Sequence, residues 1–356
     1  MKHILVLFPK DWDIDELEQP RYRTRYTFYY EGFDLFSFPQ NLKLATFNAR
    51  RYAEKLATKY RGRIDGVISN NEQFGALIAA VVAKLLGLPG TDPAVIIAAQ
   101  HKYYARCLQQ KILPEATPKF AVFPYHVRSA GDCGLPFPFY VKPVKATYSV
   151  LARTVGHFDE LRAHLTFNPL EKLIIRKLVK PFNDLMARYT PFDIDAHHLI
   201  AEEIMTGAQV NVDGYVQNGK VHVLGIVDEV MYPGTQAFMR FEYPSRLPPE
   251  ALLRMKALTE KLFTAIDYGY GFFNIELIYN PDEDSLHVIE INPRMASQIV
   301  NLYRRVDGYD PYDLLISLSI GEAPHVTFGA GEFGAAASFV FRRFDGHEVK
   351  RVPGQA

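Results

Sequence analysis

Two glutamates and an asparagine in the stretch 271–297 have the types and the spacing of a metal site. The stretch, GFFNIELIYNPDEDSLHVIEINPRMAS, predicts two strands joined by a turn rich in Pro, Asp and Ser. Because successive side chains of a strand alternate between its faces, this hairpin places Glu276 opposite Glu290, and Asn274 opposite Asn292, on one face. Two carboxylates that face each other across a strand pair repel, and a bound cation would remove that repulsion.

The ligand set of this hairpin favours a hard cation. Oxygen ligands from Glu276, Glu290 and Asn292 suit Mg²⁺, which proteins commonly hold with a few carboxylates and substrate phosphates. Arg294 follows the last strand at a point where it could contact a phosphate or a carboxylate. The alternative is a solvent-facing hairpin whose acids are only solvated. The other face is predicted to be apolar, and its residues are Phe273, Ile275, Leu277, Ile289 and Ile291.

The first 90 residues predict a small doubly wound α/β domain. The apolar runs 3–8 and 64–69 are typical of strands buried in a parallel sheet, and 45–60 and 74–86 have helical spacing. Strand, helix, strand and helix is the order of such a domain. The basic and aromatic segment 21–30 is predicted to be a solvated loop or helix face, because a formal net charge of zero gives no footprint for nucleic acid.

The next part of the chain carries two basic residues on one predicted helix. Asp92 is a good N-cap and Pro93 suits the first helical position, so a helix is predicted from there to about Lys111. This helix places Lys102 and Arg106 one turn apart on one face. Taken alone, such a pair indicates a solvated helix face.

Lys142 stands at the end of a predicted strand, 137–142, because Pro143 cannot donate to a sheet ladder. A loop that contains Ser149 follows, and 152–155 is predicted as the return strand. Periodicity and turn signals predict the later elements, which are a helix at 157–167, a strand at 173–179, a hairpin of 209–216 and 220–230, and a helix at 249–266.

The stretch 232–249 is long for a loop of a compact domain, and such loops are often functional. It contains Arg240 and Arg246. Either guanidinium could steady an anionic substrate, and we favour Arg240.

The order of these motifs resembles the ATP-grasp superfamily. FNIE and EINPR are similar to its metal-binding end, where two acids and an Asn hold Mg²⁺ against the phosphates of ATP. The segment 88–120, LPGTDPAVIIAAQHKYYARCLQQKILPEATPKF, is similar to its phosphate-binding region. The resemblance implies ATP and Mg²⁺, with Mn²⁺ as a substitute. It assigns nucleotide phosphates to Lys102, Lys142 and Ser149, the metal to Glu276, Glu290 and Asn292, and charge stabilisation to Arg294.

The segment 199–205, LIAEEIM, resembles the superfamily's link between its two lobes. The resemblance implies that backbone groups of Glu203 and Met205 bind the adenine edge and that Glu202 accepts its amino group. Gln209 occupies a place where an acid commonly binds the ribose hydroxyls, and its amide could still hydrogen-bond.

The phosphate loop departs from the superfamily's pattern. Its usual glycines are replaced by Ala146, Tyr148 and Leu151, and glycine is what lets backbone N–H groups approach a phosphate closely. We therefore expect Lys142, with Lys145 and the hydroxyls of the loop, to carry more of the phosphate binding.

The predicted fold class is α/β, with a small N-terminal doubly wound (Rossmann-like) domain followed by a two-lobed α+β ATP-grasp fold. The predicted domains are 1–90, a first lobe at 91–200, a second lobe with the metal site at 201–325, and a C-terminal strand segment at 326–356. Related ligases often continue into a further subdomain, which is expected to be absent or shortened here.

The resemblance implies an ATP-dependent ligase that activates a small-molecule carboxylate as an acyl phosphate for attack by an amine. Two alternatives stay open, namely a bicarbonate-activating enzyme of the carboxylase or carbamoyl-phosphate type, and a nucleotide-binding protein without turnover. Two cysteines give no disulfide framework, and no segment has the pattern of a signal peptide or a membrane span. We expect a cytoplasmic protein with no nucleic-acid or membrane partner, and a homodimer is compatible with the resemblance.

Overall fold

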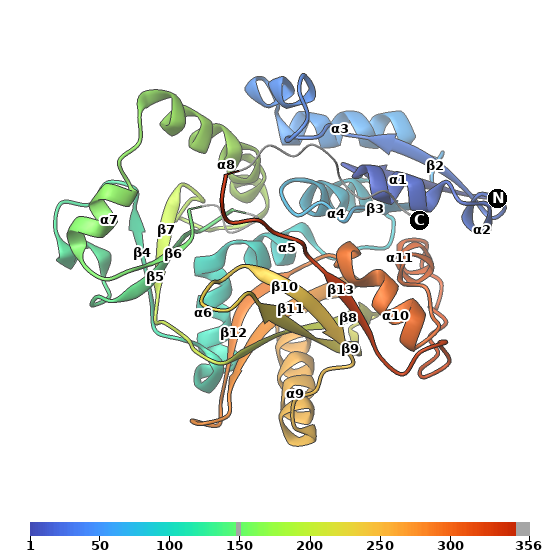
Figure 1. Cartoon of the computed structure of the whole chain (residues 1–356). Coiled ribbons are helices and arrows are strands. Elements are labelled where there is room, and N and C mark those ends of the chain that lie inside the picture. Colours follow the sequence, from blue (N-terminus) through green and yellow to red (C-terminus); the bar gives the residue numbers. More distant parts are fainter. Residues whose placement is uncertain (147–150, 347–356) are drawn as a thin grey trace.

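Three sheets organise the chain in a computed structural model that describes residues 1–146 and 151–346 (Figure 1). The first is parallel, and the other two are antiparallel. This arrangement confirms the predicted α/β domain followed by a two-lobed α+β part.

The N-terminal sheet has the strand order β2-β1-β3. Its central strand is β1, whose residues 4–7 are apolar and buried. An apolar central strand suits a sheet that is covered on both faces, as predicted for a doubly wound domain. The elements of this part are β1 (Lys2–Leu7), α1 (Asp11–Leu17), α2 (Pro20–Arg23), β2 (Tyr26–Glu31), the 3₁₀ turn η1 (Gln40–Ala45), α3 (Ala49–Tyr60), β3 (Gly66–Ile68) and α4 (Gly75–Leu86). The prediction for 21–30 was wrong, because its second half forms β2 beside β1.

The second sheet has the order β4-β7-β5-β6 and lies beside a helix that carries Lys102 and Arg106. The predicted helix from Asp92 to Lys111 divides at His101, whose side chain caps the second half by accepting from the N–H of Tyr104. The elements are α5 (Pro93–Gln100), α6 (Lys102–Ile112), η2 (Pro114–Ala116), β4 (Phe120–Pro124), η3 (Ala130–Cys133), β5 (Phe139–Pro143), β6 (Arg153–Val155), α7 (Phe158–His164), α8 (Pro169–Tyr189) and β7 (His198–Glu202).

The predicted strand at 173–179 was wrong, because these residues form part of helix α8. Asn168 accepts hydrogen bonds from the N–H groups of Leu170 and Glu171, and the Glu171 carboxylate accepts one from the N–H of Asn168. This capping box, with Pro169 at the first helical position, starts the helix and outweighs the strand preference of the later Leu and Ile residues.

The third sheet has the order β12-β11-β8-β9-β10-β13. Its elements are β8 (Ala208–Gln217), β9 (Lys220–Met231), β10 (Phe238–Tyr243), α9 (Pro249–Ala265), β11 (Gly271–Asn280), β12 (Ser285–Asn292), η4 (Ser297–Ile299), α10 (Val300–Val306), α11 (Pro311–Ser319) and β13 (Ala336–Phe339). Strand β10 lies inside the stretch 232–249 that was predicted as a loop. Helix α9 packs on one face of this sheet, and α10 and α11 pack toward the other (Figure 1).

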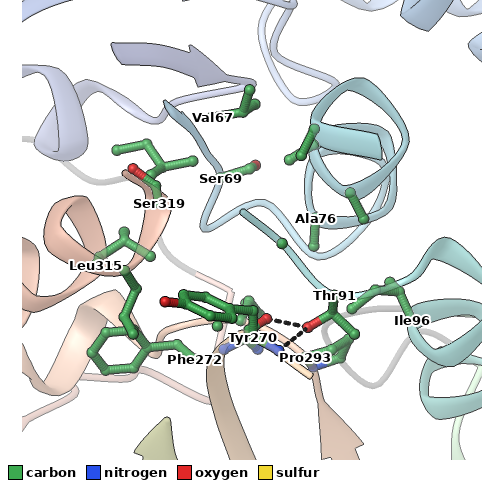
Figure 2. A pocket seen from close by; sticks show the side chains of 18 of the residues that line it. Val67, Ser69, Ala76, Thr91, Ile96, Tyr270, Phe272, Pro293, Leu315 and Ser319 are labelled. Carbon is green, nitrogen blue, oxygen red and sulfur yellow. Dashed lines mark hydrogen bonds between the residues drawn. The ribbon is translucent and has the colours of Figure 1, made fainter. Parts of the chain in front are cut away.

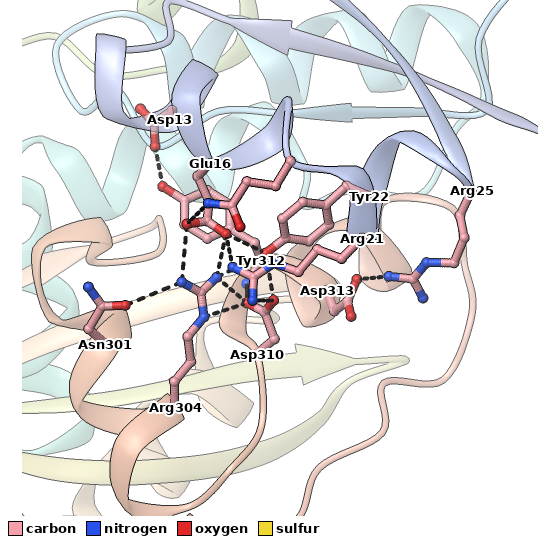
Figure 3. A network of polar contacts seen from close by, with 11 residues as sticks. Asp13, Glu16, Arg21, Tyr22, Arg25, Asn301, Arg304, Asp310, Tyr312 and Asp313 are labelled. Atoms are coloured by element: carbon pink, nitrogen blue, oxygen red, sulfur yellow. Dashed lines mark hydrogen bonds and ion pairs between the residues drawn. The ribbon is translucent and has the colours of Figure 1, made fainter.

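A polar network joins the N-terminal helices to α10 and α11 (Figure 3). The Arg304 guanidinium donates to Glu16 at 2.8 Å and to Asp310 at 2.7 Å. The buried Tyr22 hydroxyl donates to Asp310 at 2.5 Å, and the Tyr312 hydroxyl donates to Asp13 at 2.6 Å. Since a largely buried ion pair is costly to break, this network fixes the N-terminal sheet against the end of the third sheet.

Among the residues that the structure describes, none of the helices has the length and apolar character needed to cross a membrane.

Candidate active site

The predicted pairing of the two acids is present in the register of β11 and β12. Glu276 lies opposite Glu290, and Asn274 lies opposite Asn292. The Asn292 amide donates to Asn274 Oδ1 at 3.1 Å and to Glu276 Oε1 at 3.0 Å. Both N–H groups of Asn292 are therefore used, which leaves its Oδ1 to bind a cation.

One expectation about the apolar face of this hairpin was wrong. A β-bulge follows Glu276, so that Leu277 pairs with Val288 and the register passes over Ile289. Ile289 is half-buried, whereas Val288 and Ile291 are buried in the core with Leu277. The carbonyl of the bulged Ile289 accepts a hydrogen bond from Arg106 at 2.8 Å.

The acids of this face are largely buried, and burial makes their ionised forms less favourable. Burial raises the pKa of Glu276 to about 7, and the nearby carboxylates of Glu290 and Glu72 contribute to that rise. Burial also raises the pKa of Asp213, on β8, to about 6. Glu229 on β9 has a pKa raised well above the usual range by burial and by Glu276. A divalent cation would favour the ionised form of these groups.

The predicted ligand set fits Mg²⁺ in its chemistry. Within residues 1–146 and 151–346, no group of three or more His, Cys, Asp or Glu side chains is placed to hold a metal by itself. The set consists instead of Glu276, Glu290 and Asn292, which supply only oxygen. Mg²⁺ is usually held by one or two carboxylates and completes its shell with phosphates and water, so a small set is what a Mg-nucleotide site requires.

Lys102, at the start of α6, reaches this face from the first lobe. Its Nζ lies 2.5 Å from Glu290 Oε1. Burial alone would lower the pKa of Lys102, but the carboxylates of Glu290 and Glu72 raise it above the usual value. A charged lysine therefore stands beside a predicted metal ligand, where the phosphates of a metal-bound nucleotide would lie.

Lys142, Arg106 and Glu202 form a buried ion triad. Lys142 Nζ lies 2.7 Å from Glu202 Oε2, and Arg106 Nε donates to Glu202 Oε1 at 2.7 Å. Burial would raise the pKa of Glu202, but the two cations lower it to about 2. Glu202 Oε2 lies beside Lys142 but accepts no hydrogen bond from the described residues. A carboxylate oxygen can accept from more than one donor, so Glu202 could still accept from an adenine amino group.

Replacing Glu202 by Gln is expected to lower the free energy of unfolding at pH 7 by about 3 kcal/mol, because Arg106 and Lys142 lose a buried partner. The folded-state pKa of about 2 lies below the ordinary value of 4.5. The wild-type contribution is therefore complete above pH 4.5 and disappears as the pH falls toward 2. Urea unfolding at pH 7, 4.5 and 3 measures both effects.

The control for this prediction is Glu203→Gln, because Glu203 forms an exposed ion pair with Lys119 at 3.5 Å. Its effect is expected to stay within about 0.5 kcal/mol. An equal loss of stability in both variants, or an unchanged pH dependence in Glu202→Gln, would contradict the buried triad.

The segment after β7 contains the residues predicted to bind adenine. The Glu203 N–H donates to the Lys119 carbonyl at 2.9 Å, so the carbonyl is the Glu203 backbone group that remains for a ligand. Met205 is half-buried and lies between β7 and β8. Gln209 donates to Glu276 Oε2 at 3.4 Å, which places its amide beside the metal face.

Arg294 is held by Glu72, a residue to which sequence reasoning gave no role. Arg294 Nη2 donates to Glu72 Oε2 at 2.6 Å, and Lys145 Nζ donates to the Glu72 carbonyl at 3.0 Å. Burial lowers the pKa of Lys145 to about 8. Glu72 follows the carboxyl end of β3, and ligands bind at that edge of parallel sheets, so this position was the available signal.

Arg240 does not join the cluster. It pairs with Val230, whereas the next residue, Phe241, pairs with Glu229. Arg240 therefore lies on the face opposite to Glu229, where its Nε donates to Glu242 at 2.6 Å. The sequence alone could not predict on which face Arg240 lies, because that face depends on the register of β10 with β9.

Ser149 and most of the glycine-poor loop lie outside the described residues. The prediction that the hydroxyls of Thr147 and Ser149 bind phosphate therefore stays a prediction. On the near side of this loop, Lys102 Nζ donates to the Ala146 carbonyl at 3.4 Å.

Comparisons with known proteins support the fold. Residues 135–301 match the ATP-grasp domain. The structure is similar to an L-amino acid ligase from Bacillus licheniformis, with a TM-score of 0.66 and 19% identity over 96% of this chain and 80% of that one. It is also similar to N5-carboxyaminoimidazole ribonucleotide synthetase from Thermus thermophilus, with a TM-score of 0.64 and 16% identity over 94% and 82%.

A sequence relative is the carbamoyl phosphate synthase large chain of Clostridium acetobutylicum, 25% identical over 129 residues. The match covers 35% of this chain and 12% of the relative. Together, the comparisons confirm the resemblance to the ATP-grasp superfamily and its fold.

Proposed function

We propose that this chain, whose residues 135–301 match the ATP-grasp domain, is an ATP-dependent ligase that joins a carboxylate to an amine. The observation that carries the proposal is the contact between Lys102 of the first lobe and Glu290 of the second, at 2.5 Å. It brings together, between the lobes, the cation that we propose to bind phosphate and the acid that we propose to bind the metal. A nucleotide whose phosphates lie there would contact both.

The proposed reaction has two steps. A carboxylate oxygen of the substrate attacks the γ-phosphorus of ATP, and the bond from that phosphorus to the bridging oxygen of ADP breaks. The amine nitrogen then attacks the carbonyl carbon of the acyl phosphate, phosphate leaves, and the nitrogen loses a proton. A bound Mg²⁺ would neutralise charge on the phosphate oxygens.

The residues of the chain would orient and stabilise these groups. Glu276, Glu290 and Asn292 would hold the metal, while Lys102 and Lys142 would bind phosphate oxygens. Arg294 would stabilise charge on the transferring group, for which a bidentate guanidinium is well suited. Backbone groups of Glu203 and Met205, with Gln209 beside the metal face, are proposed to hold the nucleoside.

An assay of phosphate release from ATP tests this function. The protein is incubated with Mg-ATP and a panel of amino acids, singly and in pairs, and product is followed by mass spectrometry. We expect one ADP and one phosphate for each amide bond formed. Tight binding of Mg-ATP with no turnover across the panel would contradict ligase activity.

A second candidate is activation of bicarbonate. Two comparisons support this candidate. One is the match to the carbamoyl phosphate synthase large chain, and the other is the similarity to an N5-carboxyaminoimidazole ribonucleotide synthetase. Bicarbonate is therefore a separate arm of the same assay. Phosphate release that requires bicarbonate, and not an organic acid, would support this candidate over the first.

A further inference from the structure

A cavity lies between the N-terminal domain and the third sheet, next to Arg294 (Figure 2). Its volume is about 90 Å³, which is several times the space that one water molecule needs. Its walls include α4, the end of β3, the start of β11, helix α11 and the segment 293–295. Figure 2 shows Tyr270 and Phe272 of this β11 region facing Ala76 of α4 across this space.

The hydroxyl groups in the walls already have partners. Ser69 Oγ donates to the Leu7 carbonyl at 2.6 Å, and Ser319 Oγ donates to the Ile316 carbonyl at 2.8 Å. Thr91 Oγ1 donates to the Tyr270 carbonyl (Figure 2). Because these donors are satisfied by the backbone, they need no hydrogen-bond partner from an occupant, and the remaining lining includes Ala, Val, Ile and Leu side chains.

Short side chains create the space. Ala76, Ala79, Ala80 and Ala83 all line the cavity from α4. The two domains are nevertheless in tight contact at one end, since a Cβ added at Gly66 would lie 2.4 Å from Ser319 Oγ. The cavity therefore results from the size of the alanines on α4 and not from loose docking of the domains.

Arg294 is the one charged residue among the described residues that line the cavity. It connects the cavity to the metal face, because it closely follows the β12 strand that ends with Asn292. Its guanidinium already holds the Glu72 carboxylate at 2.6 Å. Arg294 Nε and Nη2 hold Glu72, whereas Nη1 makes only a 3.5 Å contact with the Met295 carbonyl. Nη1 could therefore bind a substrate carboxylate while Glu72 stays paired.

We propose that this cavity binds the apolar side chain of the acid substrate, with the substrate carboxylate on Arg294. This inference rests on the proposed ligase function and narrows its substrate to acids with a branched or aromatic side chain, such as apolar amino acids. The alanine face of α4 then sets the size of the accepted side chain.

Filling the cavity tests the inference. In Ala80→Leu, kcat/KM for leucine and phenylalanine is expected to fall about 10- to 100-fold, while the value for glycine or alanine changes less than about threefold. Ala80→Val adds less volume. It is expected to lower kcat/KM for leucine and phenylalanine more than for glycine or alanine, but by a smaller factor than Ala80→Leu. Ala257→Leu, on an exposed position of α9, is the matched control and should leave all substrates unchanged.

A binding measurement separates this inference from the ligase proposal. Calorimetry with 3-phenylpropanoate, without ATP, should show binding to the wild type and to Ala257→Leu, and binding to Ala80→Leu that is weaker by about tenfold or more. That result would support the cavity even if no acid is turned over. Equal binding by all three, or an equal loss of activity for glycine and phenylalanine in a folded Ala80→Leu, would overturn the inference.

Discussion

Replacing Glu290 by Gln is expected to lower kcat/KM of the proposed ligase about 1000-fold or more. The change keeps the shape of the side chain and removes the negative charge that faces Glu276 and lies 2.5 Å from Lys102. A weaker metal site leaves the charge on the phosphate oxygens unneutralised, and a loss of this size corresponds to about 4 kcal/mol of transition-state stabilisation. Steady-state phosphate release at several Mg²⁺ concentrations measures it.

The matched control is Glu242→Gln. Glu242 also forms an ion pair within the third sheet, with Arg240 at 2.6 Å, but on the opposite face. It should leave kcat/KM within about twofold of the wild type. If Glu290→Gln were as active as Glu242→Gln, the metal role of the hairpin would be wrong.

Replacing Arg294 by Met is expected to lower turnover about 100- to 1000-fold, the usual range for loss of one group that stabilises developing charge. The same change leaves the largely buried Glu72 carboxylate without its guanidinium partner. Burial alone would raise the pKa of Glu72, and Arg294 is the first of the cations that lower it. The variant should therefore also be less stable by about 3 kcal/mol.

A double variant separates these two effects. Glu72→Gln with Arg294→Met removes the unpaired charge, so most of the stability should return, whereas turnover should stay low. Thermal unfolding and phosphate release on the same samples give both readings. Recovery of turnover together with stability would show that Arg294 has only a structural role.

The pairing of Glu276 with Glu290 could be predicted from the sequence, because it depends only on local rules. A strand alternates its side chains, the turn after Tyr279 is marked by Pro and Asp, and the register follows. Strands β1 and β3 and helix α9 were predicted for the same reason, whereas β2 was not. The bulge at Ile289 was not, because nothing in the local sequence distinguishes one extra residue from a regular strand.

The parts that sequence reasoning missed depend on contacts between distant segments. Glu72 and Arg294 are 222 residues apart, and Arg106 and Glu202 are 96 apart. Each residue alone is typical of a solvated surface, and only the packing of the domains brings them together. The face on which Arg240 lies depends on the pairing of β10 with β9, which no local pattern specifies.

The central claim is that Glu276, Glu290 and Asn292 bind the divalent ion that accompanies ATP. The most direct test is a crystal structure of the protein with Mn²⁺ and a non-hydrolysable ATP analogue, in which the anomalous signal of manganese locates the ion. The account predicts a peak coordinated by these three residues, with nucleotide phosphates beside Lys102 and Lys142. A bound nucleotide whose manganese lies elsewhere, with Glu276 and Glu290 uncoordinated, would contradict it.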